Sequence, residues 1–135
     1  MLSTGGTAQI QLDNRTLICN PELPALYLSG ERYRCQIQQA HGIELRLDRH
    51  KLAQSAMVMA EQAWSHGLDA TRLFRPWPIP SDSRVSMGLL SMLLKTLTFL
   101  DLTSFEGSSA TTARIETLLY QHVAAMLYPE LVLSA

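Results

Sequence analysis

The four histidines and two cysteines are the residues of this chain best suited to metal binding or nucleophilic catalysis. No histidine lies three or four residues from another histidine or from a cysteine, so the chain lacks a local pair of metal ligands. We therefore expect no metal and no cofactor. The histidines are His41, His50, His66 and His122.

A nucleophile would need an activating base, and neither Cys19 nor Cys35 has a histidine beside it in the sequence. Each cysteine stands in a strand-like run, which favours free buried thiols over a disulfide bridge. Glu44 and Asp48 are four residues apart, but they straddle a strand-to-helix junction, where a solvated or capping role is expected. The sequence therefore predicts no enzyme, although folding could still assemble a site from distant residues.

Three aromatic residues, Tyr27, Tyr33 and Trp64, are candidates for a pocket that takes a small aromatic or apolar ligand. The alternative is that they only pack the sheet against the first helix. His122 falls on an apolar helical stripe, which indicates a core or interface histidine.

A change of hydrophobic period places these residues on their elements. Apolar and polar residues alternate before residue 48, as in half-buried strands, and recur at helical spacing after it. The expected fold class is α+β, with a small antiparallel, barrel-like sheet of about five strands followed by three helices. A single domain is expected over residues 1–135, with strands in 8–47 and helices at 49–66, 84–102 and 110–127.

Turn residues divide the strand region. Asp13-Asn14 predicts a hairpin turn, and His41-Gly42 predicts a turn between a fourth strand at 33–38 and a fifth at 43–47. Residues 68–80 are expected to be a connector, stiffened by prolines and anchored to the core by Phe74 and Trp77. A helix start is predicted at Asp48 and a helix end at Pro129.

Composition narrows the classes of partner. The chain is 47% hydrophobic and 17% charged, with a net charge of −1 and no Lys/Arg cluster, so we expect no direct nucleic-acid binding. Polar residues interrupt the apolar stretch 87–102, so we expect no membrane span and a cytoplasmic protein.

The predicted helix at 84–102 is apolar nearly all round, which predicts a second subunit on one face. The predicted homodimer interface consists of Met92, Leu93, Leu97, Leu119, His122 and Met126.

Several segments resemble the N-terminal domain of AraC-type transcription regulators. They are Gly-Ile-Glu-Leu-Arg-Leu-Asp-Arg-His-Lys-Leu (42–52), Asn-Pro-Glu-Leu-Pro-Ala-Leu-Tyr-Leu-Ser (20–29), and 113–119 with the close at 127–131. The resemblance implies a cupin-like barrel that senses a small effector and a helical pair that dimerises. This chain departs from the pattern because it would carry only the later part of the barrel. It also has no matching metal histidines and no helix-turn-helix units.

The expected function is therefore an effector-sensing and dimerisation module without its own DNA-binding domain. Two alternatives stay open. One is a freestanding protein–protein interaction protein with no small ligand, and the other is a small hydrolase that uses a spatially assembled site.

Overall fold

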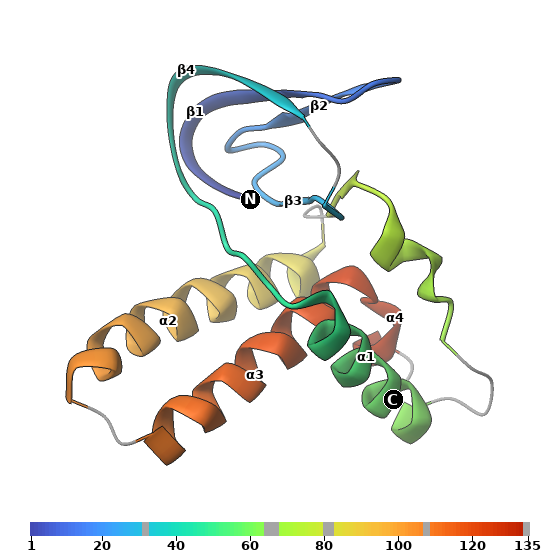
Figure 1. The fold of residues 1–135 in the computed structure, drawn as a ribbon, viewed down its shortest axis with the longest axis vertical. Helices are drawn as coiled ribbons and strands as arrows, with labels where there is room; N and C mark the ends of the chain where they lie inside the picture. The colour runs from blue at the N-terminus through green and yellow to red at the C-terminus, as the bar shows by residue number, and fades with distance from the viewer. Residues whose placement is uncertain (31–32, 64–67, 80–82, 107–108, 134–135) are drawn as a thin grey trace. The chain divides into compact units, whose positions relative to one another are not determined.

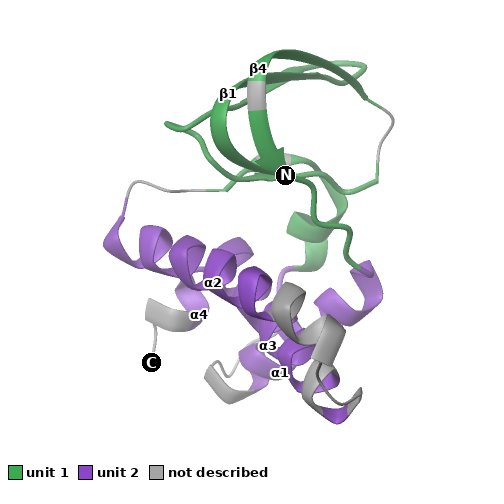
Figure 2. Ribbon diagram, turned by 90° about the vertical axis from the view of Figure 1, so that its left-hand side faces the viewer, with its two compact units in different colours: residues 1–47, 70–81 green, residues 48–69, 82–135 purple. Residues whose placement is uncertain are grey.

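The structure is a computed structural model that describes residues 1–30, 33–63, 68–79, 83–106 and 109–133. Two compact units divide the chain (Figure 2). Unit 1 comprises residues 1–47 and 70–81, and unit 2 comprises residues 48–69 and 82–135. The single domain over residues 1–135 stays a prediction.

A three-stranded antiparallel sheet forms most of unit 1 (Figure 1). Its strands are β1 (Leu2–Gln11), β2 (Thr16–Cys19) and β4 (Arg34–Ile43), with β1 in the centre. The amide of Leu12 donates to the carbonyl of Arg15 at 2.9 Å, which closes the hairpin turn predicted at Asp13-Asn14.

The inner face of this sheet follows the alternation read from the sequence. Ile10 of β1 lies opposite Leu17 of β2, and Ala8 lies opposite Cys19, and all four are buried. Ile18, between two buried neighbours, points to the other face and is exposed. Period two therefore sets which side chains of β1 and β2 enter the core.

The predicted turn at His41-Gly42 is wrong, because both residues belong to β4. Gly42 pairs with Ser3 of β1, and a Cβ at Gly42 would collide with the carbonyl oxygen of Leu2. The glycine thus permits a close approach between two strands rather than a change of direction. The predicted fifth strand at 43–47 does not form, and only Ile43 of that range is in a strand.

The predicted connector is in part a structural element of unit 1. It contains a 3₁₀ helix at Ala70–Phe74 and strand β5 (Trp77–Pro78), which pairs with β3 (Leu26–Tyr27). Leu73 and Ile79 are buried, whereas Phe74 is 59% exposed, so the expected anchor at Phe74 is wrong. The side chain of Trp77 lies outside the described part of the structure.

Helices make up unit 2: α1 (Arg49–Ala63), α2 (Arg84–Glu106), α3 (Ser109–Leu127) and the short α4 (Glu130–Leu133). α3 contacts both α1 and α2 (Figure 1). Asp48 begins α1 as predicted, since its Oδ1 accepts the amides of His50 at 2.8 Å and Lys51 at 3.3 Å. α3 ends at Leu127, two residues before Pro129, also as predicted.

The α+β class is confirmed. The five described strands are all antiparallel, three in one sheet and two in another, and they are accompanied by three long helices. The described helices include none whose length and hydropathy would allow it to cross a membrane.

Candidate ligand pocket and association surface

A pocket of about 230 Å³ lies over the inner face of the three-stranded sheet and is called here the sheet pocket. Strands β1, β2 and β4 all contribute to it, together with the chain just after β4. Most of its walls are apolar, as small-molecule sites require. The lining residues are Met1, Leu2, Ser3, Ala8, Cys19, Cys35, Ile37, His41, Gly42, Ile43 and Glu44.

One polar atom in the sheet pocket stands out. The hydroxyl oxygen of Ser3 is buried, and it makes no hydrogen bond within the described structure. A buried hydroxyl without a partner costs about 1–3 kcal/mol, so a bound molecule that supplied a partner would recover that free energy. Residue type and spacing gave no sign of this role for Ser3, because only folding shows that its hydroxyl is enclosed.

Of the predicted pocket aromatics, neither Tyr27 nor Tyr33 lines the sheet pocket. Tyr27 donates its hydroxyl to the carbonyl of Leu73 at 2.9 Å, and it does not line the sheet pocket. Tyr33 packs against the core cluster of the sheet, and its hydroxyl donates to Oε1 of Glu44 at 3.3 Å. Tyr33 therefore contacts a residue that lines the pocket, Glu44. Trp64 lies outside the described residues.

The two cysteines are free thiols, as expected, but they differ in environment. Cys19 is buried, and its Sγ lies 3.7 Å from the carbonyl oxygen of Pro24. Burial raises the pKa of the Cys19 thiol, which keeps it protonated and poorly nucleophilic. Cys35 is exposed, contrary to the expectation that both are buried, because nothing in the described chain covers that face of β4.

We expect one thiol of the native chain to react with a disulfide reagent at pH 8 and the second only after unfolding. In the Cys35→Ser variant the remaining thiol should react at least about 100-fold more slowly, since modification then requires local opening. A rapid reaction of folded Cys35→Ser with the disulfide reagent would contradict the burial of Cys19. Denatured Cys35→Ser provides the control, because its single thiol should react freely.

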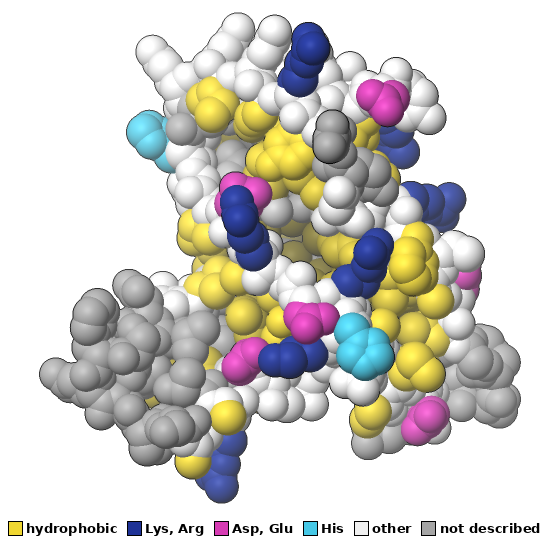
Figure 3. Space-filling view, in the orientation of Figure 1, with side chains coloured by type: hydrophobic (Ala, Val, Ile, Leu, Met, Phe, Trp, Pro, Cys, Tyr) yellow, Lys and Arg dark blue, Asp and Glu magenta, His cyan; other side chains and the backbone are white. Residues whose placement is uncertain are grey.

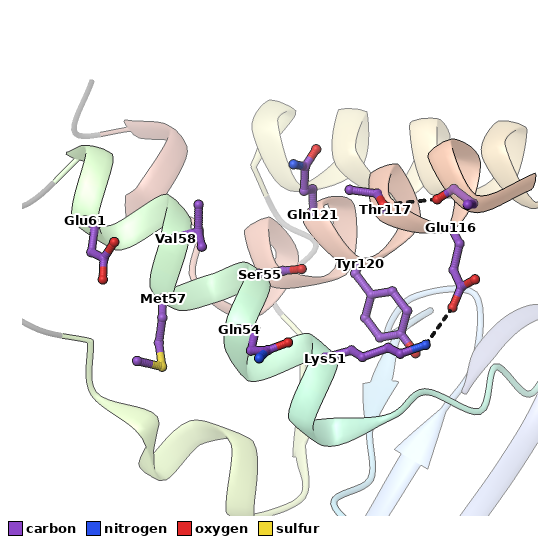
Figure 4. Close-up of a pocket in the computed structure, with 11 residues that line it drawn as sticks. Lys51, Gln54, Ser55, Met57, Val58, Glu61, Glu116, Thr117, Tyr120 and Gln121 are labelled. Atoms are coloured by element: carbon purple, nitrogen blue, oxygen red, sulfur yellow. Dashed lines mark hydrogen bonds and ion pairs between the residues drawn. The ribbon is translucent and has the colours of Figure 1, made fainter. Parts of the chain in front are cut away.

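A second hollow of about 700 Å³, the α1–α3 groove, lies between two helices of unit 2 (Figure 4). Lys51 of α1 and Glu116 of α3 form an ion pair of 3.3 Å at one end, and Tyr120 stands beside them. Met57 and Glu61 line the groove but point away from α3. The groove is thus an open interhelical hollow with mixed polar and apolar walls and one ion pair at its end.

The chemistry available in this groove is limited. The hydrogen bond from Lys51 to Glu116 raises the pKa of the ammonium group, so it stays charged and is no nucleophile near neutral pH. The hydroxyl of Tyr120 accepts the amide of Asp48 at 3.0 Å and so helps to hold the start of α1. Within the described chain, no three His, Cys, Asp or Glu side chains come together as a metal site.

One face of α2 carries an exposed stripe, which we call the α2 stripe. It consists of Gly88, Met92, Lys95 and Phe99, spaced i, i+4, i+7 and i+11. Met92 and Phe99 are 50% and 55% exposed. A Cβ at Gly88 would meet nothing within 4 Å, so the chain itself gives no packing reason for this glycine. The signal available in the sequence was a glycine inside a long helical pattern, and the prediction did not use it.

The predicted interface residues separate into two groups. Leu93, Leu119 and Met126 are buried, so the core of the chain itself uses these side chains. Leu97 is half-buried, and so is His122, whose Nδ1 lies 3.4 Å from the hydroxyl of Thr96 on the neighbouring helix. Met92 is the one exposed member, and it stands on the α2 stripe.

The described Lys and Arg side chains are dispersed on the face drawn in Figure 3, with Asp and Glu side chains interleaved among them.

No family model, curated protein or solved structure matched the chain in comparisons with known proteins.

Proposed function

We propose that this chain is a non-catalytic regulatory module of the cytoplasm. It forms a homodimer through the α2 stripe and takes a small apolar or aromatic effector in the sheet pocket. This function is the one that the resemblance to AraC-type effector domains implies, with no DNA-binding part of its own. The proposal depends above all on the unfilled position at Gly88, on an exposed stripe that also presents the apolar side chains of Met92 and Phe99.

Gly88 carries a cost that a partner would explain. Glycine inside a helix lowers stability by about 1 kcal/mol relative to alanine, and nothing in the described chain occupies the space above it. Close approach of another helix is a common reason for a small residue at such a place. The α2 stripe therefore has the form of a docking surface for a helix.

The stripe is complementary to itself when two copies of α2 run antiparallel. In that arrangement Gly88 of one copy faces Phe99 of the other, and Met92 faces Lys95. The aromatic ring fills the space over the glycine, and the methylene stem of Lys95 covers Met92 while its ammonium group reaches water. An interface that matches itself under a two-fold axis favours a homodimer.

The sheet pocket suits a ligand of one ring with one hydrogen-bonding group. A cavity of about 150 Å³ is enough for benzene, so about 230 Å³ accommodates a ring with a small substituent. The unpartnered Ser3 hydroxyl would bind that substituent. Phenol and benzoate are simple probes of this chemistry, and glucose serves as a polar comparison.

We expect phenol or benzoate, but not glucose, to raise the melting temperature in proportion to the logarithm of its concentration. Ser3→Ala should weaken that binding about 5- to 10-fold, because one hydrogen bond of about 1–1.5 kcal/mol is lost. Ser29→Ala, a buried serine outside the pocket, is the matched control and should leave the ligand affinity unchanged. If neither aromatic probe raises the melting temperature of a chain that still dimerises, the proposed effector binding is wrong. The alternative of a ligand-free interaction protein then stands.

A further inference from the structure

We infer that the outer edge of β4 pairs with the same edge of a second copy, antiparallel and with Gln36 opposite Gln36. This pairing concerns unit 1 and uses backbone groups, whereas the proposed α2-stripe dimer uses helix side chains of unit 2. Within the described chain β4 is an edge strand that pairs with β1 alone. Its unpaired amide and carbonyl groups are available for a further strand.

Residues 34–38 of the β4 edge carry one charge, that of Arg34, and no lysine, proline or bulge, so few of the features that usually block such pairing are present there. Natural edge strands carry lysines, prolines or short lengths that discourage association. β4 has ten residues, Arg34–Ile43, without a lysine or a proline. Every residue from 34 to 39 is exposed, and Ile37 is 64% exposed although it belongs to the apolar face of the strand. This length of open, largely uncharged edge is suited to β-sheet extension.

A bulge limits the pairing to the first half of β4. The register with β1 shifts between the pairs Gly5–His41 and Thr7–Gln38, and Gln39 has φ of 50°. Regular strand geometry is therefore confined to residues 34–38 on this side of the bulge. The midpoint of that regular segment is Gln36.

The apolar pattern allows this register, and the length of the regular segment selects it. Two copies of an edge pair antiparallel only when the partner positions share the same parity, so that outward amides meet outward carbonyls. With Gln36 on the two-fold axis, Cys35 of each copy faces Ile37 of the other, and the apolar faces join. A shift by one residue at the axis would place Cys35 or Ile37 opposite itself and leave part of the regular segment unpaired.

Charge does not oppose pairing with a second copy. The segment 34–38 carries one charge, that of Arg34, and its opposite position in this register is the neutral Gln38. The two Arg34 side chains would start about 13 Å apart along the strands, so their repulsion is small. The edge is thus compatible with a second copy of itself in apolar pattern and in charge.

The test uses the full chain with Phe99→Asp, so that association through the α2 stripe is removed. Gln36→Lys and Gln36→Glu should each weaken self-association about fivefold, because like charges then oppose each other on the axis. A one-to-one mixture of the two variants should form a heterodimer at least as tight as the parent pair. Thr16→Lys, on the opposite edge strand of the same sheet, is the control and should change nothing.

Disulfide formation gives the register directly. In a Cys35→Ser background, Gln36→Cys should cross-link two copies, since facing Cβ atoms lie about 5 Å apart, whereas Arg34→Cys and Gln38→Cys should not. Equal cross-linking at all three positions, or a Phe99→Asp chain that is monomeric at high concentration, would overturn the β4 pairing. If Phe99→Asp leaves association intact and the Gln36 variants abolish it, the helix dimer fails while the β4 pairing stands.

Discussion

Replacing Ile10 with alanine should lower the free energy of unfolding of unit 1 by about 2–5 kcal/mol, as expected for removing most of a fully buried aliphatic side chain. Ile10 lies in the central strand, is completely buried, and faces Leu17 on one side and Cys35 on the other. The loss combines the transfer free energy of the removed methyl groups with the cavity that they leave. Urea unfolding followed by tryptophan fluorescence and far-ultraviolet circular dichroism measures it.

Ile18→Ala is the matched control for that experiment. Ile18 stands in the neighbouring strand β2, faces the opposite side of the sheet and is 43% exposed. Its replacement should cost less than about 1 kcal/mol, because little apolar surface is lost and no cavity forms. Equal destabilisation by the two variants would mean that the inner face of the sheet is assigned incorrectly.

Replacing Phe99 with aspartate should raise the dissociation constant of the α2-stripe dimer at least about 100-fold. Each buried phenylalanine contributes about 1.5–3 kcal/mol, and the two-fold axis removes it from both copies at once. The aspartate also introduces a charge where the second helix must approach. Sedimentation velocity over a concentration series gives the dissociation constant, and circular dichroism shows whether the helices persist.

Two further variants, Gly88→Leu and Met57→Asp, test whether the loss of association is specific to the α2 stripe. Gly88→Leu should favour the isolated helix yet weaken the dimer, since it fills the space meant for Phe99 of the second copy. Met57→Asp changes a methionine of α1 that is 52% exposed, close to the 50% of Met92, and it should leave association unchanged. A dimer that tolerates Gly88→Leu but is lost in Met57→Asp would assign the interface to α1 instead.

Local signals in the sequence were sufficient for the elements that form from nearby residues. The hairpin at Asp13-Asn14, the helix start at Asp48 and the helix end before Pro129 each depend on side chains a few residues apart. Alternation predicted half-buried strands, and Ile10 and Leu17 are buried while Ile18 is exposed, because successive side chains of a strand point to opposite faces.

The errors arose where long-range contacts decide the structure. Gly42 serves the approach of β1, forty residues away, and a turn-forming residue looks the same in sequence. The connector belongs to unit 1, and its residues Leu73 and Ile79 are buried. No local pattern in the sequence predicts this burial. Alternation also shows which face Cys35 and Ile37 occupy but not whether anything covers that face, and in this chain both are exposed.

The candidate site was predicted less well than the fold. A pocket was expected around aromatic residues, whereas the sheet pocket is lined mostly by small and aliphatic side chains, together with His41, Glu44 and the unpartnered hydroxyl of Ser3. The predicted helix α2 does carry an exposed apolar face, yet half of the residues assigned to the interface are buried within the chain. Helical periodicity identifies apolar faces, and only packing shows which of them stays open.

Multi-angle light scattering of the unmodified chain measures self-association without any substitution. Across a concentration series up to several milligrams per millilitre, we predict a mass of at least twice the 15.1 kDa of one chain. A mass that stays at 15.1 kDa up to the highest concentration would contradict both the α2-stripe dimer and the β4 pairing.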